Sequence, residues 1–238
     1  GVKVAMEEPG YQAARNAFLL KSNDLQSMPL DQEGLIVDER LNDCSFVYVT
    51  PSHHYPSTVT MSLARRRALL DAATDYGFVI IEDDYEFETN YLSEPIPALK
   101  SLDRDDRVIY VGSLSKSLFP GLRLGYMVGP RQLISEVRAL RRLMLHHPPN
   151  NNQRTAALFM ALGYHDTLIK RLHKVYRERW QKMGEALEKH LPNSSDVPSF
   201  GGTSYWVRGP KGLDSEELAA RALEKGVVIE PGHMTFAR

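Results

Sequence analysis

Apolar runs of strand length alternate with helical stretches through the first half of this 238-residue chain. Parallel strands need a crossover connection of a dozen or more residues, so this alternation predicts a mostly parallel sheet covered by helices on both faces. The nearly unbroken apolar run FVII, at residues 78–81, predicts a central strand. The predicted strands are Val2 to Met6, Phe46 to Thr50, Phe78 to Asp83, Val108 to Gly112, and Gly125 to Val128. The chain is therefore expected to be an α/β protein.

The clearest helix is predicted to begin at Ser62 and to end at Gly77. Serine is a preferred N-cap residue, and glycine readily adopts the left-handed conformation that ends a helix. The run Arg65, Arg66 and Arg67 lies within it. Such a run on a helix is usually a solvated face or a subunit contact, which we prefer to a DNA contact.

The chain is expected to divide into three parts. Residues 1–150 read as most of a large domain, residues 151–190 as a helical connection, and residues 191–238 as part of a small α+β domain. In the last part we predict strands at TSYWV (203–207) and VVIE (227–230), with a helix from about Ser215 to Lys225 between them. The chain opens on a strand and stops as an apolar segment begins, so both termini are expected to be cuts in a longer protein.

Charge and composition restrict the possible partners. The chain has 29 basic and 30 acidic residues, a balance that creates no field to attract nucleic acid or a membrane surface. Any DNA contact is thus expected through a domain that is not in this chain. A single cysteine excludes an internal disulfide and points to a reducing cytoplasm. No apolar run reaches membrane-spanning length, so no membrane partner is expected.

One motif carries recognisable chemistry: GSLSKSLFPGLRLGY, at residues 112–126. Lys116 follows a predicted buried strand and lies among hydroxyls rather than carboxylates, which suits a lysine that forms an imine. Ser113 and Ser115, with Arg123 returning after the Pro-Gly turn, offer two hydroxyls and a planar fork of donors for a phosphate. A lysine imine beside a phosphate cradle describes bound pyridoxal 5'-phosphate (PLP).

An acidic strand end supplies the second requirement of this cofactor. The pyridine nitrogen of PLP needs a carboxylate partner, and FVIIEDDYEFE offers Asp83 or Asp84, with Tyr85 available for the ring oxygen. A helix cap is one alternative. A nucleotide site is disfavoured because no glycine-rich loop ending in Lys-Ser or Lys-Thr occurs. A metal held by these acids with His53 or His54 is disfavoured because alternate strand residues diverge, so no metal is predicted.

The motif resembles the lysine segment of fold-type I PLP enzymes, the aspartate aminotransferase superfamily, in the version used by aminoadipate and kynurenine aminotransferases. The resemblance extends along almost the whole chain. It implies that Lys116 carries the internal aldimine, that Asp83 pairs with the pyridine nitrogen and that Tyr85 binds the ring oxygen. It also implies a phosphate held by Ser113, Ser115 and Arg123, and an aromatic stack on the ring from Tyr11.

Two departures from the enzymes narrow the resemblance. Tyr55, in TPSHHYPST, stands where aminotransferases have the asparagine that binds the ring oxygen, and EDDYEFE lacks the usual proline. Both departures resemble the MocR subgroup of GntR-type bacterial transcriptional regulators. This implies a winged-helix DNA-binding domain before the chain, a homodimer, and a small amine or amino-acid effector sensed by aldimine exchange at Lys116.

Two rival functions stay open. One is an aminotransferase of an amino acid with a 2-oxo acid acceptor, and the other is a PLP-free relative retained as an interaction domain. Upstream sequence would separate a regulator, with its winged helix, from an enzyme, with a short arm.

Effector contacts are predicted at His53 and His54, near the edge of the cofactor, and at Asn150 in the loop HHPPNNNQ. SHHYP and this loop are similar to segments of regulators of taurine or ectoine catabolism. The family's glycine-rich phosphate turn is expected before Gly1, and its carboxylate-binding arginine beyond Arg238.

Overall fold

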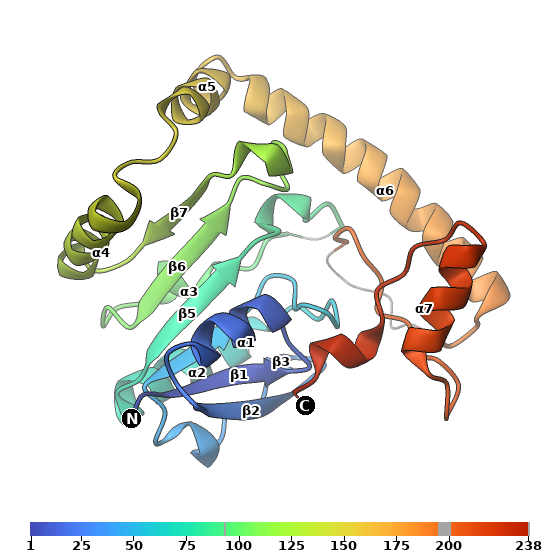
Figure 1. Cartoon of the computed structure of the whole chain (residues 1–238), viewed down its shortest axis with the longest axis horizontal. Helices are drawn as coiled ribbons and strands as arrows, with labels where there is room; N and C mark the ends of the chain where they lie inside the picture. Colours follow the sequence, from blue (N-terminus) through green and yellow to red (C-terminus); the bar gives the residue numbers. More distant parts are fainter. Residues whose placement is uncertain (93, 195–200, 238) are drawn as a thin grey trace.

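A seven-stranded sheet organises the first half of the chain in the computed structural model, which describes residues 1–92, 94–194 and 201–237 (Figure 1). The strand order is β3-β2-β1-β4-β5-β6-β7, and only the outer pairs β2–β3 and β6–β7 are antiparallel. The strands are β1 (Lys3–Glu8), β2 (Asp24–Asp31), β3 (Gly34–Leu35), β4 (Phe46–Val49), β5 (Val79–Asp84), β6 (Val108–Ser113) and β7 (Gly125–Val128). The predicted α/β class with a mostly parallel sheet is confirmed.

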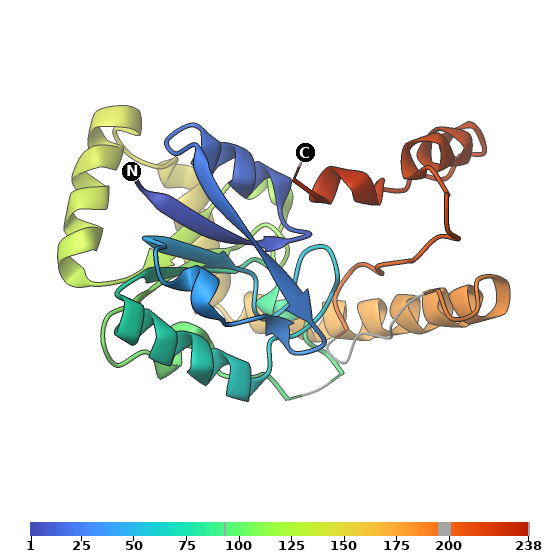
Figure 2. The same ribbon diagram turned by 90° about the horizontal axis from the view of Figure 1, so that it is seen from below.

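Helices cover both faces of this sheet. Figure 2 shows α1 on one side of the strands and α2 on the other. The larger core lies between the sheet and α2 and includes Val47, Leu69 and Ile80. A smaller cluster under α1 includes Met6 and Tyr48. The helices are α1 (Gln12–Leu19), α2 (Leu63–Tyr76), α3 (Leu99–Leu102), α4 (Arg131–Leu145), α5 (Asn150–Ala161), α6 (Tyr164–His190) and α7 (Ser215–Glu224).

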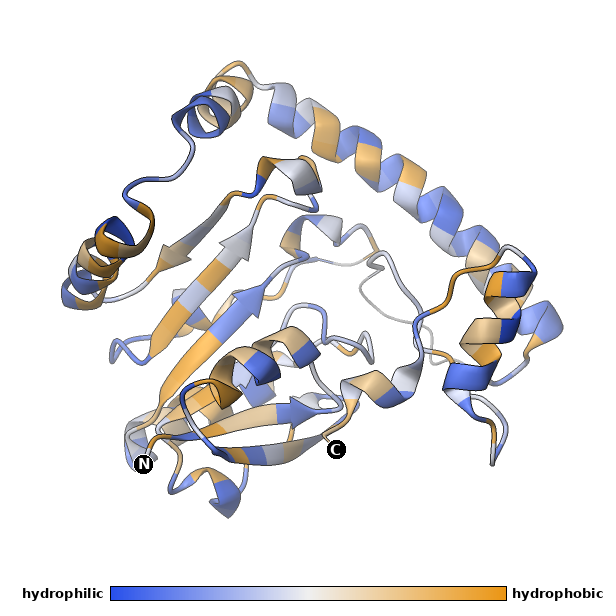
Figure 3. Cartoon of the chain, viewed as in Figure 1, coloured by the Kyte–Doolittle hydropathy of each residue, from blue (hydrophilic) through white to orange (hydrophobic). Residues whose placement is uncertain are grey.

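The middle strand β5 explains the position of the acidic residues. It pairs in parallel with β4 and β6 and is therefore enclosed on both edges. Its sequence VIIEDD is apolar where it crosses the core and acidic where it leaves it, which Figure 3 shows as a change from orange to blue along the strand. In open α/β sheets, ligands bind outside the carboxyl ends of the strands. The fold thus places the acids where a ligand site is expected.

The ends of α2 agree with the sequence prediction. Ser62 Oγ accepts a hydrogen bond from the backbone N–H of Arg65 at 3.1 Å, and Gly77 ends the helix at φ 82°. A side-chain oxygen at the N-cap satisfies one of the first N–H groups, which have no partner within the helix. Local signals were sufficient here because both caps act on the neighbouring backbone.

Arg66, in contrast, corrects the prediction of a solvated arginine face. Its side chain is fully buried, and the guanidinium donates to the carbonyls of Met61 (3.1 Å), Pro97 (3.2 Å) and Pro51 (2.9 Å). Its Nη1 also lies 3.6 Å from Oε1 of the buried Glu82. The interpretation failed because two of the three acceptors, the carbonyls of Pro51 and Pro97, lie 15 and 31 residues away in the sequence.

Two further differences concern strands. β2 and β3 were not predicted, because the sequence of β2, DLQSMPLD, mixes polar with apolar residues and contains a proline. Conversely, residues 203–207 and 227–230 are not strands, and Val228 is 83% exposed. A strand needs a neighbouring strand to which it is hydrogen-bonded, and among the described residues neither segment has one.

The chain beyond β7 is mainly helical. Figure 1 shows α4, α5 and the long α6 following one another around the outside of the sheet, with α7 near the far end of α6. The extents of the three predicted domains remain predictions. In the part of the chain that the structure describes, no helix combines the length and the apolar character needed to cross a membrane.

Candidate functional site

The lysine motif folds back on itself between β6 and β7. Ser113, the last residue of β6, pairs with Gly125 of β7, and Leu114 N donates to Leu124 O at 3.1 Å. A 3₁₀ turn at Pro120–Leu122 precedes Arg123, which adopts the left-handed conformation at φ 51°. The turn therefore brings the backbone next to Arg123 back to the end of β6 that carries Ser113, and the role of Arg123 at a phosphate stays a prediction.

Lys116 lies in this connection with its side chain 47% exposed. Its Nζ is 3.9 Å from Oε1 of Glu86, whose side chain is only 1% exposed. Glu86 comes two residues after β5. The lysine on one segment thus faces a buried carboxylate from the neighbouring segment, a partner that the sequence analysis did not anticipate.

The two candidate aspartates point to opposite faces of β5. Asp83 Oδ2 accepts a hydrogen bond from the hydroxyl of Tyr48 at 2.5 Å, on the face covered by α1. Asp84 Oδ2 accepts from Tyr110 at 3.0 Å. Burial raises the pKa of both carboxyls, while these hydrogen bonds oppose the shift. Adjacent residues of a strand point to opposite faces of the sheet, so only one of the two aspartates can face a given ligand.

Tyr85 and His53 extend the cluster around Glu86. The ring centroids of Tyr85 and His53 are 6.4 Å apart in an edge-to-face arrangement, and His53 Nε2 lies 3.3 Å from Glu86 Oε2. Burial lowers the pKa of His53, against the opposing effect of Glu86, and burial also raises the pKa of Tyr85. Burial thus favours the neutral forms of the imidazole and the phenol.

A second aromatic pair lies at the N-terminus of α1. The rings of Tyr11 and Tyr55 meet edge to face at 5.4 Å, and Tyr11 is 43% exposed. The Tyr55 hydroxyl donates to Glu230 Oε1 at 2.6 Å. Burial, together with this carboxylate, raises the pKa of Tyr55. Two of the three tyrosines that the sequence assigned to the cofactor, Tyr11 and Tyr55, are therefore neighbours, and the C-terminal segment contacts Tyr55.

His54 belongs to a separate buried group with Glu7. Glu7 Oε2 accepts hydrogen bonds from the backbone N–H and the hydroxyl of Thr50, each at 3.0 Å, and lies 3.5 Å from His54 Nε2. Ser57 Oγ lies 2.6 Å from His54 Nδ1. Burial raises the pKa of Glu7 to about 7 and lowers that of His54 to about 3. The pair is thus neutral over much of the acidic range.

This burial of Glu7 predicts a pH-dependent stability. A carboxyl whose pKa is higher in the folded than in the unfolded state contributes stability below its unfolded pKa, and this contribution is lost as the pH rises through the folded pKa. We expect the free energy of unfolding of wild type to fall by about 2–3 kcal/mol more than that of Glu7→Gln between about pH 4.5 and 7.5. Urea unfolding at both pH values measures the difference.

Comparison with a variant cancels the other groups that titrate in this range. Burial likewise raises the pKa of Glu82 to about 7. Glu82, His53 and His54 are present in both proteins, so their contributions cancel in the difference. Glu188→Gln, at an exposed position of α6, is the control and should follow wild type. An identical pH profile for Glu7→Gln and wild type would contradict the assignment.

The residues assigned to a phosphate are accessible to an anion. Ser113 Oγ accepts from the backbone N–H of Ser115 at 3.2 Å, and Arg123 is exposed. Within the described residues, Arg123 makes no ion pair. Its guanidinium and both hydroxyls can therefore serve an outside ligand. Together with Lys116 and the partly buried Asp83, this donor set fits PLP in its chemistry.

Asn150 is not brought to these residues by a direct contact. It is the exposed first residue of α5, and its Oδ1 accepts from Gln153 at 3.5 Å. Asn152 Nδ2 instead donates to Leu122 O at 3.0 Å, so the start of α5 rests on the turn before Arg123. The HHPPNNNQ loop is thus anchored beside the lysine motif, and Asn150 stays a prediction as an effector contact.

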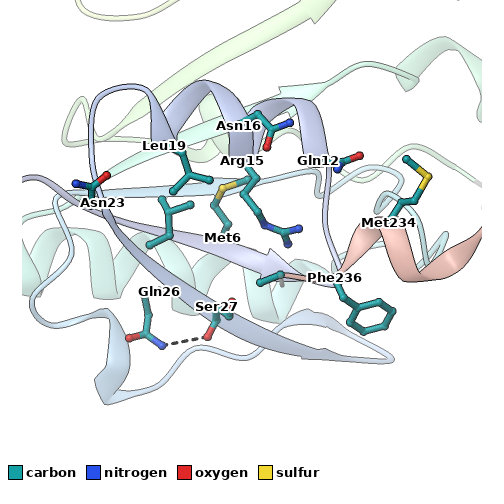
Figure 4. Close-up of a pocket in the computed structure, with 12 residues that line it drawn as sticks. Met6, Gln12, Arg15, Asn16, Leu19, Asn23, Gln26, Ser27, Met234 and Phe236 are labelled. Carbon is teal, nitrogen blue, oxygen red and sulfur yellow. Dashed lines mark hydrogen bonds between the residues drawn. The ribbon is translucent and has the colours of Figure 1, made fainter.

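A cavity of about 340 Å³ lies elsewhere, between α1, β2 and the C-terminal segment (Figure 4). Its lining includes Gln12, Asn16, Gln26 and Phe236 but neither Lys116 nor its neighbours. In residues 1–92, 94–194 and 201–237, no three His, Cys, Asp or Glu side chains are grouped to hold a metal ion.

The sequence did not predict a role for four residues of this region, which are Glu7, Tyr48, Glu86 and Glu230. Tyr48 could have been found, because it alternates along β4 onto the face of Asp83. Glu86 was part of the quoted acidic run, but nothing local indicated that its carboxylate turns toward Lys116. Glu7 and Glu230 depend on contacts across the fold.

Known proteins resemble this chain along nearly its whole length. Residues 1–236 match the family described as aminotransferase class I and II. The chain is 44% identical over 236 residues to the HTH-type transcriptional regulator TauR of Rhodobacter capsulatus, covering 99% of this chain and 49% of that protein. It is 32% identical to the probable rhizopine catabolism regulatory protein MocR of Rhizobium meliloti, covering 95% of this chain and 46% of that protein.

A solved structure agrees closely in fold. The crystal structure of Pyrococcus horikoshii kynurenine aminotransferase matches with a TM-score of 0.92 at 34% identity, covering 99% of this chain and 61% of that chain. The chain spans about half the length of the two regulators that it matches.

Proposed function

The chain belongs to the aminotransferase class I and II family, and on this basis we propose that it is the PLP-binding, effector-sensing domain of a bacterial MocR-type transcriptional regulator. The observation that carries the proposal is the position of Lys116, between phosphate-type donors on its own segment and the acids that end β5. DNA binding would belong to a further domain, and the functional unit would be a homodimer.

PLP, when bound, supplies an aldehyde carbon that forms reversible imines with amines. Lys116 would hold that carbon through Nζ. Asp83, kept in place by the Tyr48 hydroxyl, would keep a proton on the pyridine nitrogen. Tyr85 would donate to the ring oxygen, as its neutral phenol permits. The phosphate would be held by Ser113, Ser115 and Arg123.

Tyr55 supports a sensor more than an enzyme. It replaces the asparagine of the resembling aminotransferases, and in this structure its hydroxyl is engaged by Glu230. A small amine or amino acid would take the place of Lys116 on the cofactor without completing amino-group transfer. The regulators TauR and MocR, similar over 99% and 95% of this chain, support the same proposal.

Transamination of an amino acid with a 2-oxo acid acceptor is the second candidate. It is favoured by the similarity to kynurenine aminotransferase, whose fold the chain matches with a TM-score of 0.92. Weak activity of this kind is compatible with a site in which lysine, aspartate and tyrosine are all present.

An absorbance titration separates the two functions. We expect the full-length, PLP-loaded protein to shift its visible band when titrated with a panel of amines and amino acids, and then to stay at the new spectrum. Addition of a keto acid should change nothing further. Bleaching to pyridoxamine phosphate, with recovery on adding the keto acid, would identify an aminotransferase instead.

A further inference from the structure

Glu86 is a buried carboxylate whose contacts are made by side chains rather than by the backbone. Oε2 faces His53 at 3.3 Å, and Oε1 accepts from Thr203 Oγ1 and faces Lys116 Nζ at 3.9 Å. Although Glu86 immediately precedes a short 3₁₀ helix, its side chain does not cap it. A buried charge needs a compensating partner, so the identity of these neighbours decides what the carboxylate does.

Another buried acid, Glu82 on β5, has structural partners. Glu82 accepts from the backbone N–H groups of Leu99 (2.7 Å) and Lys100 (2.8 Å), which caps α3, and it lies beside Arg66. Within the described residues, no backbone N–H donates to Glu86. Unlike Glu82, Glu86 therefore does not hold the N-terminus of a helix.

Residues 201–203 help to hold Glu86 in place through Oε1, the carboxylate oxygen that also faces Lys116. Gly201 and Gly202 have φ of 103° and 82°, which bring Thr203 onto the carboxylate. A Cβ on Gly202 would lie 2.3 Å from the His53 ring, so only glycine permits this approach. Tyr91 fixes the same segment through a 2.6 Å hydrogen bond to Gly202 O. The carboxylate is thus preorganised toward Lys116.

The charges of its neighbours identify Lys116 as the partner that compensates the Glu86 carboxylate. Burial lowers the pKa of His53 and favours its neutral form, and the Thr203 hydroxyl is neutral. Among the described residues, Lys116 is then the cation within 4 Å of Glu86. An opposite charge at this distance stabilises the ammonium form of a lysine.

We propose that Glu86 is the positioning residue that receives the Lys116 ammonium when an effector amine displaces it. This inference rests on the proposed function, because it concerns the same exchange. In that step, the effector nitrogen bonds to the aldehyde carbon of the cofactor, and the bond from this carbon to Nζ breaks. Two protons pass from the effector ammonium to Nζ, and nothing is oxidised or reduced. By stabilising the released ammonium, Glu86 favours the effector-bound state.

The first test uses the full-length, cofactor-free protein. Only the neutral amine reacts with an acylating reagent, so acetic anhydride at pH 7.5, with mass spectrometry of the Lys116 peptide, reports how strongly the ammonium is held. We expect Glu86→Gln to raise the acetylation rate of Lys116 about 3- to 10-fold. Lys100, which is paired with Asp103 at 2.8 Å, is the internal reference and should not change.

Two variants control for structure. Glu88→Gln removes the same charge two residues away, without contact to Lys116, and should match wild type. Glu86→Asp keeps the charge but moves it away from Lys116. Its acetylation rate at Lys116 should lie between those of wild type and Glu86→Gln. This variant keeps the test decisive if Glu86→Gln fails to fold. Equal Lys116 rates in wild type and the Glu86 variants would overturn the proposal.

The second test uses the PLP-loaded protein with methylamine as the probe. Glu86→Gln should raise the concentration of methylamine needed for half displacement of Lys116 about 3- to 10-fold. Faster acetylation with unchanged displacement would overturn the role in exchange. If neither protein binds PLP, the proposed function and the exchange role both fail, while acetylation still decides whether Glu86 holds the lysine.

Discussion

Lys116→Ala is expected to abolish the visible imine absorption of the PLP-loaded protein. The structure offers Nζ of Lys116 at the carboxyl end of the sheet, beside Ser113 and Ser115, and the side chain is open to solvent on one side. Without the amine, no covalent link to the aldehyde can form at this site. The measurement is the visible spectrum after gel filtration, together with mass spectrometry after borohydride reduction. The expected loss of the reduced adduct is complete.

Lys116→Arg is the matched control for charge. It keeps a cation near Glu86 but cannot form the imine, so it should also lose the adduct while retaining the folded state. Lys174→Ala, at an exposed position of α6, should retain both the band and the adduct. An adduct that persists in Lys116→Arg would mean that a different amine holds the cofactor.

Replacement of Arg66 is expected to have the largest effect on stability. The guanidinium satisfies the carbonyls of Pro51, Met61 and Pro97 and lies beside the buried Glu82. Arg66→Met leaves these acceptors without a donor and a buried carboxylate without its cation. Removing one partner of a buried pair costs about 3–5 kcal/mol. The free energy of unfolding from urea denaturation at pH 7.5 measures the loss.

The neighbouring arginine provides the control. Arg67→Met, on the exposed side of the same helix, should change stability by less than about 0.5 kcal/mol. In the double variant Arg66→Met with Glu82→Gln, the loss should be smaller than the sum of the two single losses, because no uncompensated charge is left. Equal losses for Arg66→Met and Arg67→Met would contradict the assigned contacts.

The effect matters for function because Arg66 contacts a loop and a strand that carry site residues. Pro51 precedes the segment that contains His53 and Tyr55, and Glu82 belongs to the strand that delivers Asp83. Partial loss of PLP binding in Arg66→Met is therefore expected as a secondary consequence. It should recover at lower temperature, whereas the loss in Lys116→Ala should not.

Local patterns were sufficient for the fold class and for the lysine segment. Apolar runs separated by helical stretches imply a parallel sheet, and β1, β4, β5, β6 and β7 lie within about two residues of the predicted strands. The caps of α2 and the turn before Arg123 also follow from residues that act on their own neighbours. These features depend on interactions within one segment, which a sequence shows directly.

Contacts between segments were decided only by the tertiary structure. Glu86 meets His53, Lys116 and Thr203 across gaps of 30 residues or more, and Arg66 becomes a buried core residue because distant carbonyls converge on it. The same holds for the segments 203–207 and 227–230, which had the composition of strands but have no strand partner among the described residues. The sequence by itself determined which groups of this protein can do chemistry and on which elements they lie. Their burial, their partners and therefore their protonation were determined by packing, because desolvation and pairing depend on what the rest of the chain brings to each side chain.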